Sequence, residues 1–285
     1  MIIYLTGCGY TVIALRGVNW IQQNTELYGI RYLSRYRLNL HLPGNLSGSQ
    51  YKMKKTLEEI KAGYSPEKQK TDPVWVRILI RKLSFYVAWV AMRCGITAFH
   101  VSMFALILPV VAMIFWLTSK PFIAIILLNI WLLLDCVDGN IARSVGGNQM
   151  GDFVDATSGY MMIGFSFFGI GSYLDIISIN WYGISNPGFT IIGALSSILN
   201  LLTRVYYQKY MNVLSKSDLS NNIVNPRGVI KSIDRNIGIG GFFTPLLLVS
   251  YFFDMLPLML IFYAIYTLFF FLGISGKLLS YSKYN

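Results

Sequence analysis

The chain has 285 residues, of which 54% are hydrophobic and 13% are charged, and its mean hydropathy is +0.51. These values are typical of a polytopic membrane protein and exclude an ordinary soluble domain. The formal net charge of +11 does not indicate a nucleic-acid partner, because the basic residues follow a topological pattern along the chain. We therefore predict a protein embedded in a lipid bilayer that binds no nucleic acid.

Residues 1–50 form an N-terminal extension whose role the sequence leaves open. An apolar run over residues 1–15 is followed by Arg16, and a basic, aromatic stretch covers residues 28–42. The apolar run has no charged leading segment, so we do not interpret it as a signal peptide, and it is short for a membrane span. An interfacial segment and a start assigned too early are the two open interpretations.

Residues 51–98 are predicted to form a polar segment followed by an amphipathic juxtamembrane helix. Residues 52–70 are polar and charged. Between residues 74 and 94, basic side chains such as Arg77 and Arg81 alternate with apolar and aromatic ones at helical spacing. Because aromatic side chains suit the headgroup level, we expect this helix to lie on the cytoplasmic leaflet.

Residues 99–285 are predicted to form a six-helix membrane domain. Most of the apolar stretches are near the length that crosses about 30 Å of hydrocarbon, and the second is short because its far end is acidic. The fold class is therefore all-α, as a polytopic membrane protein. The predicted spans are Phe99–Thr118, Phe122–Val137, Phe153–Leu174, Gly188–Tyr206, Ile237–Phe253 and Leu256–Gly276.

The distribution of basic residues sets the expected orientation. Fourteen of the 24 Lys and Arg residues precede the first span, six lie between Arg204 and Arg235, and two follow the last span. Only Lys120 falls in a loop on the other side. The positive-inside rule then places both termini, and the acids at the end of the second span, on the cytoplasmic side of an inner or plasma membrane.

Four aspartates gather where the second and third predicted spans meet: Asp135, Asp138, Asp152 and Asp155. Carboxylates beside a bilayer are costly unless a cation compensates them. Arg143 is the one basic residue nearby in the sequence, and it cannot neutralise four acids. Because oxygen-only ligation favours Mg²⁺ or Mn²⁺, these acids predict a site for a divalent metal.

The spacing of these residues suits the binding of phosphate. Asp135 and Asp138 lie at i and i+3, so their carboxylates project from one face of a helix. Gly139 lets a ligand approach the backbone, and Ala142 leaves space one turn further on. Arg143 offers a fork of donors that matches a phosphate group. Phosphate chemistry is therefore the expected activity.

The same residues resemble the signature of the CDP-alcohol phosphatidyltransferase family, Asp-x2-Asp-Gly-x2-Ala-Arg followed by Gly-x3-Asp-x3-Asp. The resemblance implies transfer of a substituted phosphate from a CDP-linked donor, CDP-diacylglycerol or another CDP-alcohol, to an alcohol acceptor, with release of CMP. It also implies a homodimer and a role in phospholipid or related glycolipid biosynthesis. By this resemblance Asp135, Asp138 and Asp155 hold the metal, and the residues that shape the nucleotide pocket are Gly139, Ala142, Arg143 and Gly151.

The chain departs from the signature at two points. The linker over residues 144–150 is slightly short, and the last aspartate should fall at position 159, where this chain has Gly159. In the family that aspartate is thought to act as general base. Asp152 lies roughly 10 Å along the helix from this position, so it can substitute only with a shifted acceptor or a bridging water. The catalytic candidates are thus Asp155 and Asp152, with water or the acceptor itself as other destinations for the proton.

Two other functions stay open from the sequence. A catalytically silent family member would bind a nucleotide or lipid without releasing CMP, and Gly159 is its main support. An ion transporter would also carry acids within the membrane, but the last three spans have none near their middle. Two smaller questions are whether Arg204 engages phosphate or only fixes topology, and whether the glycines of the third span pack helices or leave a cavity. These glycines are Gly159, Gly164, Gly169 and Gly171.

Overall fold

The computed structural model describes residues 4–7, 10–13, 55–147, 149–214 and 238–282. The chain divides into two compact units, Met1–Leu46 and Ser47–Asn285. In the first unit, β1 (Tyr4–Gly7) and β2 (Tyr10–Ile13) pair in antiparallel fashion, with Tyr4 opposite Ile13. This short hairpin occupies part of the apolar run, and the basic, aromatic stretch over residues 28–42 lies outside the described residues.

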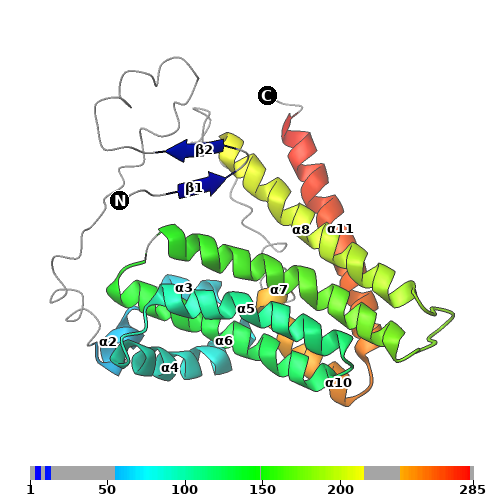
Figure 1. Cartoon of the computed structure of the whole chain (residues 1–285), viewed down its shortest axis with the longest axis horizontal. Helices are drawn as coiled ribbons and strands as arrows, with labels where there is room; N and C mark the ends of the chain where they lie inside the picture. Colours follow the sequence, from blue (N-terminus) through cyan, green and yellow to red (C-terminus); the bar gives the residue numbers. More distant parts are fainter. Residues whose placement is uncertain (1–3, 8–9, 14–54, 148, 215–237, 283–285) are drawn as a thin grey trace. The chain divides into compact units, whose positions relative to one another are not determined.

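The named elements that the structure describes in the second unit are all helices, which confirms the predicted all-α class (Figure 1). Among the helices that the structure describes there, five are long and apolar enough to cross a membrane. The elements are α2 (Leu57–Ala62), α3 (Pro66–Thr71), η1 (Val76–Ile80), α4 (Arg81–Arg93), α5 (Ala98–Leu117), α6 (Pro121–Val145), α7 (Gln149–Ile176), α8 (Gly188–Leu214), η3 (Ile239–Phe243), α10 (Thr244–Phe252) and α11 (Leu256–Ser282).

The fifth predicted span differs from the expectation of a continuous crossing helix. It consists of the π-helical turn η3, with a non-helical residue at Gly241, followed by the short α10. Glycine and proline explain the interruption, since Gly240 and Gly241 weaken the helix and Pro245 lacks the amide donor of the next turn. At about 1.5 Å per residue, the apolar stretch Gly240–Phe252 is about 20 Å long, which is less than the hydrocarbon thickness.

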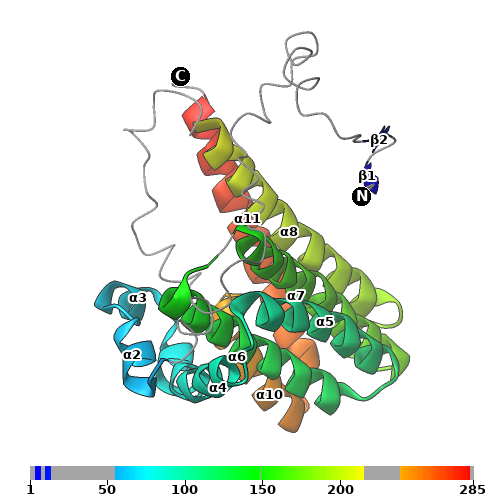
Figure 2. The ribbon, with the colours of Figure 1, turned by 60° about the vertical axis from the view of Figure 1, so that its left-hand side comes forward.

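This short element nevertheless extends to the far end of the bundle. Tyr251 and Phe252 of α10 contact Phe122, with ring centroids 5.9 and 6.1 Å from that of Phe122. Phe122 lies at the first turn of α6, whereas Asp135 and Asp138 lie toward its other end. The segment therefore runs along α6 from the level of the acids to the opposite end, and α11 returns from there (Figure 2).

Helix α5 holds the two helices of the aspartate motif in place. It packs along both α6 and α7, while α6 and α7 contact each other at only a few described positions. Its buried face contains small residues, with Ala105 and Ala112 each 1% exposed, and ends at the fully buried Trp116. The gap between the helices that carry Asp135 and Asp155 is thus set mainly by a third helix.

Helices α7 and α8 approach each other through glycines. A Cβ atom added to Gly171 would lie 2.2 Å from the carbonyl oxygen of Phe189, and one added to Gly193 would lie 2.3 Å from that of Phe167. Gly169 is similarly crowded by the indole of Trp116, at 2.6 Å. For Gly169 and Gly171, close packing is therefore the reason for glycine.

We expect Gly171→Ala to lower the free energy of unfolding by about 1–3 kcal/mol, because α8 must move away to admit the methyl group. Denaturant titration in detergent micelles, followed by tryptophan fluorescence, measures this change. Gly164→Ala on the same helix is the control, since its Cβ would make an ordinary contact of 3.6 Å with Leu201. Equal stability of the two variants would contradict the close-packing explanation.

The pre-span segment packs against α6 and leaves a second apolar face exposed. Phe85 and Ala88 of α4 are buried, whereas Leu79, Leu83, Tyr86 and Val90 are each about half exposed. These four residues share one helical face, so they form a continuous apolar stripe. Contact of this stripe with the bilayer stays a prediction.

Candidate active site

The two halves of the aspartate motif lie on consecutive helices separated by a sharp turn. Helix α6 carries Asp135 and Asp138 and ends at Val145, where Gly146 adopts a φ of 97°. Only glycine adopts this left-handed conformation readily, so it stops the helix and reverses the chain. Helix α7 starts at Gln149 and carries Asp155 in its second turn.

The structure brings two of the predicted acids together across a cavity of about 430 Å³. The carboxyl groups of Asp135 and Asp155 are close enough to interact with each other. Among the residues that the structure describes, neither forms an ion pair with a basic side chain. Two oxygen-donor groups without a direct cationic partner suit a hard divalent cation in donor chemistry. The cavity is lined by Lys68, Thr71, Asp72, Pro73, Val76, Arg81, Trp131, Leu132, Asp135, Cys136, Asp155, Ala156, Gly159, Tyr160, Ile163, Arg204, Gly238 and Gly240.

Asp138, the third predicted metal ligand, has a different environment. Its carboxylate is 5% exposed, and Oδ2 accepts a hydrogen bond of 2.7 Å from the Ser102 hydroxyl of α5. It does not line the cavity. Within the described ranges, no group of three His, Cys, Asp or Glu side chains is arranged to hold a metal ion. The structure thus shows two facing carboxylates, Asp135 and Asp155, and a third, Asp138, that is hydrogen-bonded to Ser102 of α5.

Three basic side chains line this cavity, and sequence proximity to the acids did not identify them. They are Lys68 of α3, Arg81 of α4 and Arg204 of α8. Arg143, the basic residue nearest to the acids in the sequence, has a different place. Arg143 does not line the cavity, and its Nη2 donates a hydrogen bond of 2.8 Å to Asn140 Oδ1.

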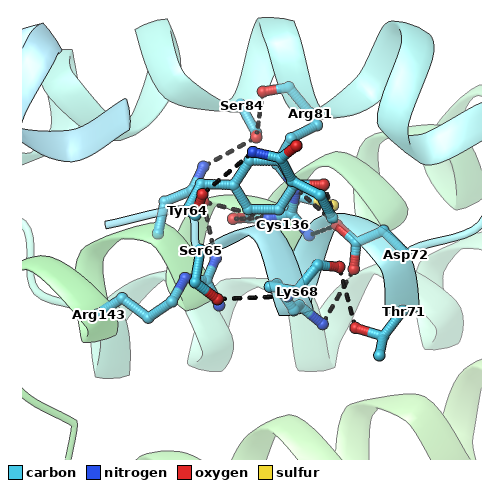
Figure 3. Close-up of polar contacts among 11 residues, drawn as sticks. Tyr64, Ser65, Lys68, Thr71, Asp72, Arg81, Ser84, Cys136 and Arg143 are labelled. Atoms are coloured by element: carbon cyan, nitrogen blue, oxygen red, sulfur yellow. Dashed lines mark hydrogen bonds and ion pairs between the residues drawn. The ribbon is translucent and has the colours of Figure 1, made fainter. Parts of the chain in front are cut away.

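Arg81 is the centre of a buried polar network that joins the pre-span segment to α6 (Figure 3). Its Nε and Nη2 donate to Asp72 Oδ2 at 3.0 and 2.5 Å. Its Nη1 donates to the Cys136 carbonyl at 3.3 Å and to Asn140 Oδ1 at 3.1 Å. The Tyr64 ring lies under the guanidinium, with 4.9 Å between Cζ and the ring centroid. The side chain of Arg81 therefore ties the chain before the first span to the helix that carries the motif.

The electrostatics of the network keep Asp72 ionised. Burial alone would raise the pKa of Asp72, but the charges and hydrogen bonds of Arg81 and Lys68 outweigh it, and the pKa lies below its usual value. Burial, together with the hydrogen bond that the Tyr64 hydroxyl donates to Asp72, raises the pKa of Tyr64 to about 12. Asp72 is thus a carboxylate and Tyr64 a neutral donor at physiological pH.

Comparison with known families identifies the bundle. Residues 95–278 match the family model of the CDP-alcohol phosphatidyltransferases. The chain belongs to the CDP-alcohol phosphatidyltransferase family. Membership implies transfer of a phosphate-containing group from a CDP-alcohol to an acceptor, and it agrees with a multi-pass membrane protein. Comparison with curated proteins and with solved structures found no match.

The CDP-alcohol phosphatidyltransferase signature is therefore divided between the cavity and its surroundings. Asp135 and Asp155 line the cavity, as does the departing position, Gly159. Asp152 is exposed and lies outside the lining. The residues predicted to shape the nucleotide pocket also lie outside the cavity lining: Gly139, Ala142, Arg143 and Gly151.

Gly159 leaves open space where the CDP-alcohol phosphatidyltransferase signature has its last aspartate. A Cβ atom added there would meet no heavy atom within 4 Å. The space is therefore not filled by a neighbouring side chain, in contrast to the crowded Gly169 and Gly171. At the residue just before Gly159, the Trp131 indole of α6 donates a hydrogen bond of 3.1 Å to Ser158 Oγ, which fixes the cavity wall beside this position. Gly159 is thus the glycine of the third span that leaves a cavity.

Proposed function

We propose that this protein is a metal-dependent phosphotransferase that moves a substituted phosphate from a CDP-linked donor to an alcohol and releases CMP. The observation that carries the proposal is the facing pair Asp135 and Asp155 in a cavity that basic residues also line. Such a cavity suits a diphosphate, whose charge requires cations, together with a metal held by carboxylates. The products would serve phospholipid or related glycolipid synthesis.

We assign Asp135, Asp138 and Asp155 to Mg²⁺ or Mn²⁺, on the basis of the family signature and their carboxylate donors. When bound, the metal compensates negative charge on the diphosphate and on the leaving CMP. Gly139, Ala142, Arg143 and Gly151 are assigned to the nucleotide. Because most of them follow Asp135 along α6 and lie outside the cavity lining, we place the nucleoside toward the end of α6, beyond the cavity.

In the reaction, the acceptor hydroxyl oxygen forms a bond to the phosphorus, and the bond from that phosphorus to the CMP oxygen breaks. The hydroxyl proton needs an acceptor, since Gly159 supplies none. Asp155 lines the cavity one turn before Gly159, whereas Asp152 is exposed outside it. This placement favours Asp155 over Asp152 as the residue nearest the reacting hydroxyl, with water as the final destination of the proton.

The test is CMP release by the purified protein in detergent. The protein is supplied with Mg²⁺ or Mn²⁺, a panel of CDP-diacylglycerol and soluble CDP-alcohols, and candidate alcohols. We expect metal-dependent CMP release from at least one donor and none from Asp138→Ala. Binding of CDP ligands without release would instead favour a silent family member, for which Gly159 is the specific support. Gly159→Asp would then be the variant expected to restore release, because the side chain has room.

We also propose that the active site faces the cytoplasm and that the protein is a homodimer in an inner or plasma membrane. Support for the orientation comes from the excess of Lys and Arg before the first span and after α8. The homodimer rests on the family resemblance alone. Accessibility of Cys94, an exposed free cysteine near the start of α5, to a membrane-impermeant maleimide tests the orientation.

A further inference from the structure

One part of the cavity lining, formed by Lys68, Asp72 and Arg81, carries more positive charge than its single carboxylate neutralises. Asp72 accepts from two cations at once, because Lys68 Nζ lies 3.0 Å from Oδ1 and Arg81 Nη2 lies 2.5 Å from Oδ2. One negative charge thus faces two positive charges. The group of Lys68, Asp72 and Arg81 carries a net charge of about +1, since Asp72 stays ionised.

The two cations differ in how firmly they are held. Arg81 is 4% exposed, and its donors are directed to Asp72, the Cys136 carbonyl and Asn140. The Lys68 side chain is 42% exposed and lines the cavity. A lysine ammonium is a flexible point charge, so it can exchange one oxygen partner for another. If Lys68 leaves Asp72, the carboxylate keeps Arg81 and the hydrogen bond from Tyr64.

Lys68 is also placed to act on the acids of the signature. Lys68 lines the same cavity as Asp135 and Asp155, and so does Arg81. An anion entering between these acids would be repelled unless a cation moved toward it. Of these two cations, Lys68 is the exposed one, and when it moves Asp72 keeps the buried Arg81 as its partner.

We propose that Lys68 is a ligand-binding residue of the active site, which releases Asp72 and binds a phosphate oxygen of the substrate in the cavity. The inference rests on the proposed function, and it adds a residue outside the family match, which begins at residue 95. The phosphate oxygen belongs either to the diphosphate of the donor or to a phosphate group on the acceptor. The pre-span helix α3 then forms part of the substrate site and does more than connect segments.

The experiment compares Lys68→Gln with Lys70→Gln in the full-length protein. Both substitutions remove one positive charge from α3. Lys70 lies two residues further on this helix and does not line the cavity, so it serves as the matched control. CDP and inorganic phosphate are each titrated by isothermal calorimetry in Mg²⁺. We expect Lys68→Gln to weaken binding of one or both ligands by about 10- to 100-fold, the scale of a charged hydrogen bond. Lys68→Arg should recover part of the affinity, and the unfolding midpoint should not change.

The two ligands separate the possible sources of the phosphate. A loss confined to CDP assigns Lys68 to the donor, and a loss confined to inorganic phosphate assigns it to the acceptor. The inference is overturned if the wild type binds CDP and Lys68→Gln binds both ligands as tightly as Lys70→Gln does; the proposed function would stand. Failure of the wild type to bind CDP at all would overturn both.

Discussion

Replacing Arg81 with methionine is expected to lower the free energy of unfolding by about 3–5 kcal/mol, the cost of removing one partner of a buried ion pair. The change takes from Asp72, which is 5% exposed, its buried cationic partner and leaves it the partly exposed Lys68 and the Tyr64 hydroxyl. It also removes the donors to Asn140 and the Cys136 carbonyl. It should also reduce CMP release, since Asn140 bonds to Arg143 of the signature. Denaturant titration in detergent micelles measures the stability.

Two further variants separate charge from packing in this prediction. Lys82→Met, one residue further on, alters an exposed lysine and should change stability by no more than about 0.5 kcal/mol. The double variant Asp72→Asn with Arg81→Met removes both charges, so it should be more stable than Arg81→Met alone. If the double variant is the less stable of the two, the loss of the Arg81 partner of Asp72 is not the source of the destabilisation.

Asp155→Asn is expected to decrease the rate of CMP release by at least about 100-fold, the lower range for loss of a positioned acid–base group. Asp155 faces Asp135 in the cavity, and the amide has no negative charge for a metal and cannot accept the acceptor proton. The rate is measured at saturating donor and metal, so that weaker binding is not mistaken for slower chemistry.

The matched control is Asp152→Asn, the same substitution three residues earlier on α7. Asp152 is exposed and does not line the cavity, so we expect its replacement to leave the rate nearly unchanged. A loss as large as that of Asp155→Asn would assign the base to Asp152 after all. That result would require α7 to turn or the acceptor to lie outside the described cavity.

The sequence predicted the long spans well because apolar length is a local property. The fifth predicted span is interrupted for a local reason that can be recognised afterwards, since Gly240, Gly241 and Pro245 weaken or break a helix. The place of Arg81 in the buried polar network is indicated only weakly by the sequence. Arg81 lies on the same face as Phe85 and Ala88, the apolar face of α4 that is buried, where a charge needs a partner.

The surroundings of the glycines and the partners of the charged residues depend on atoms that are distant along the chain, so the sequence pattern does not predict them. Gly159 and Gly171 are both helical glycines of α7, but one faces open space and the other the backbone of α8. Asp72 finds its partner nine residues away across a turn, and Lys68 reaches the cavity from before the first span. Spacing within the signature identifies neither contact, because each is formed by tertiary packing.

The position of α5 between α6 and α7 has a consequence for how members of one family come to differ. Since the two halves of the signature are spaced by this third helix, the width of the gap depends on the sizes of its buried side chains, such as Ala105 and Ala112. Larger residues there would move Asp135 and Asp155 apart without altering any signature residue. Two proteins with the same signature can therefore differ in the spacing of their acids, and the cause of that difference would be found on α5.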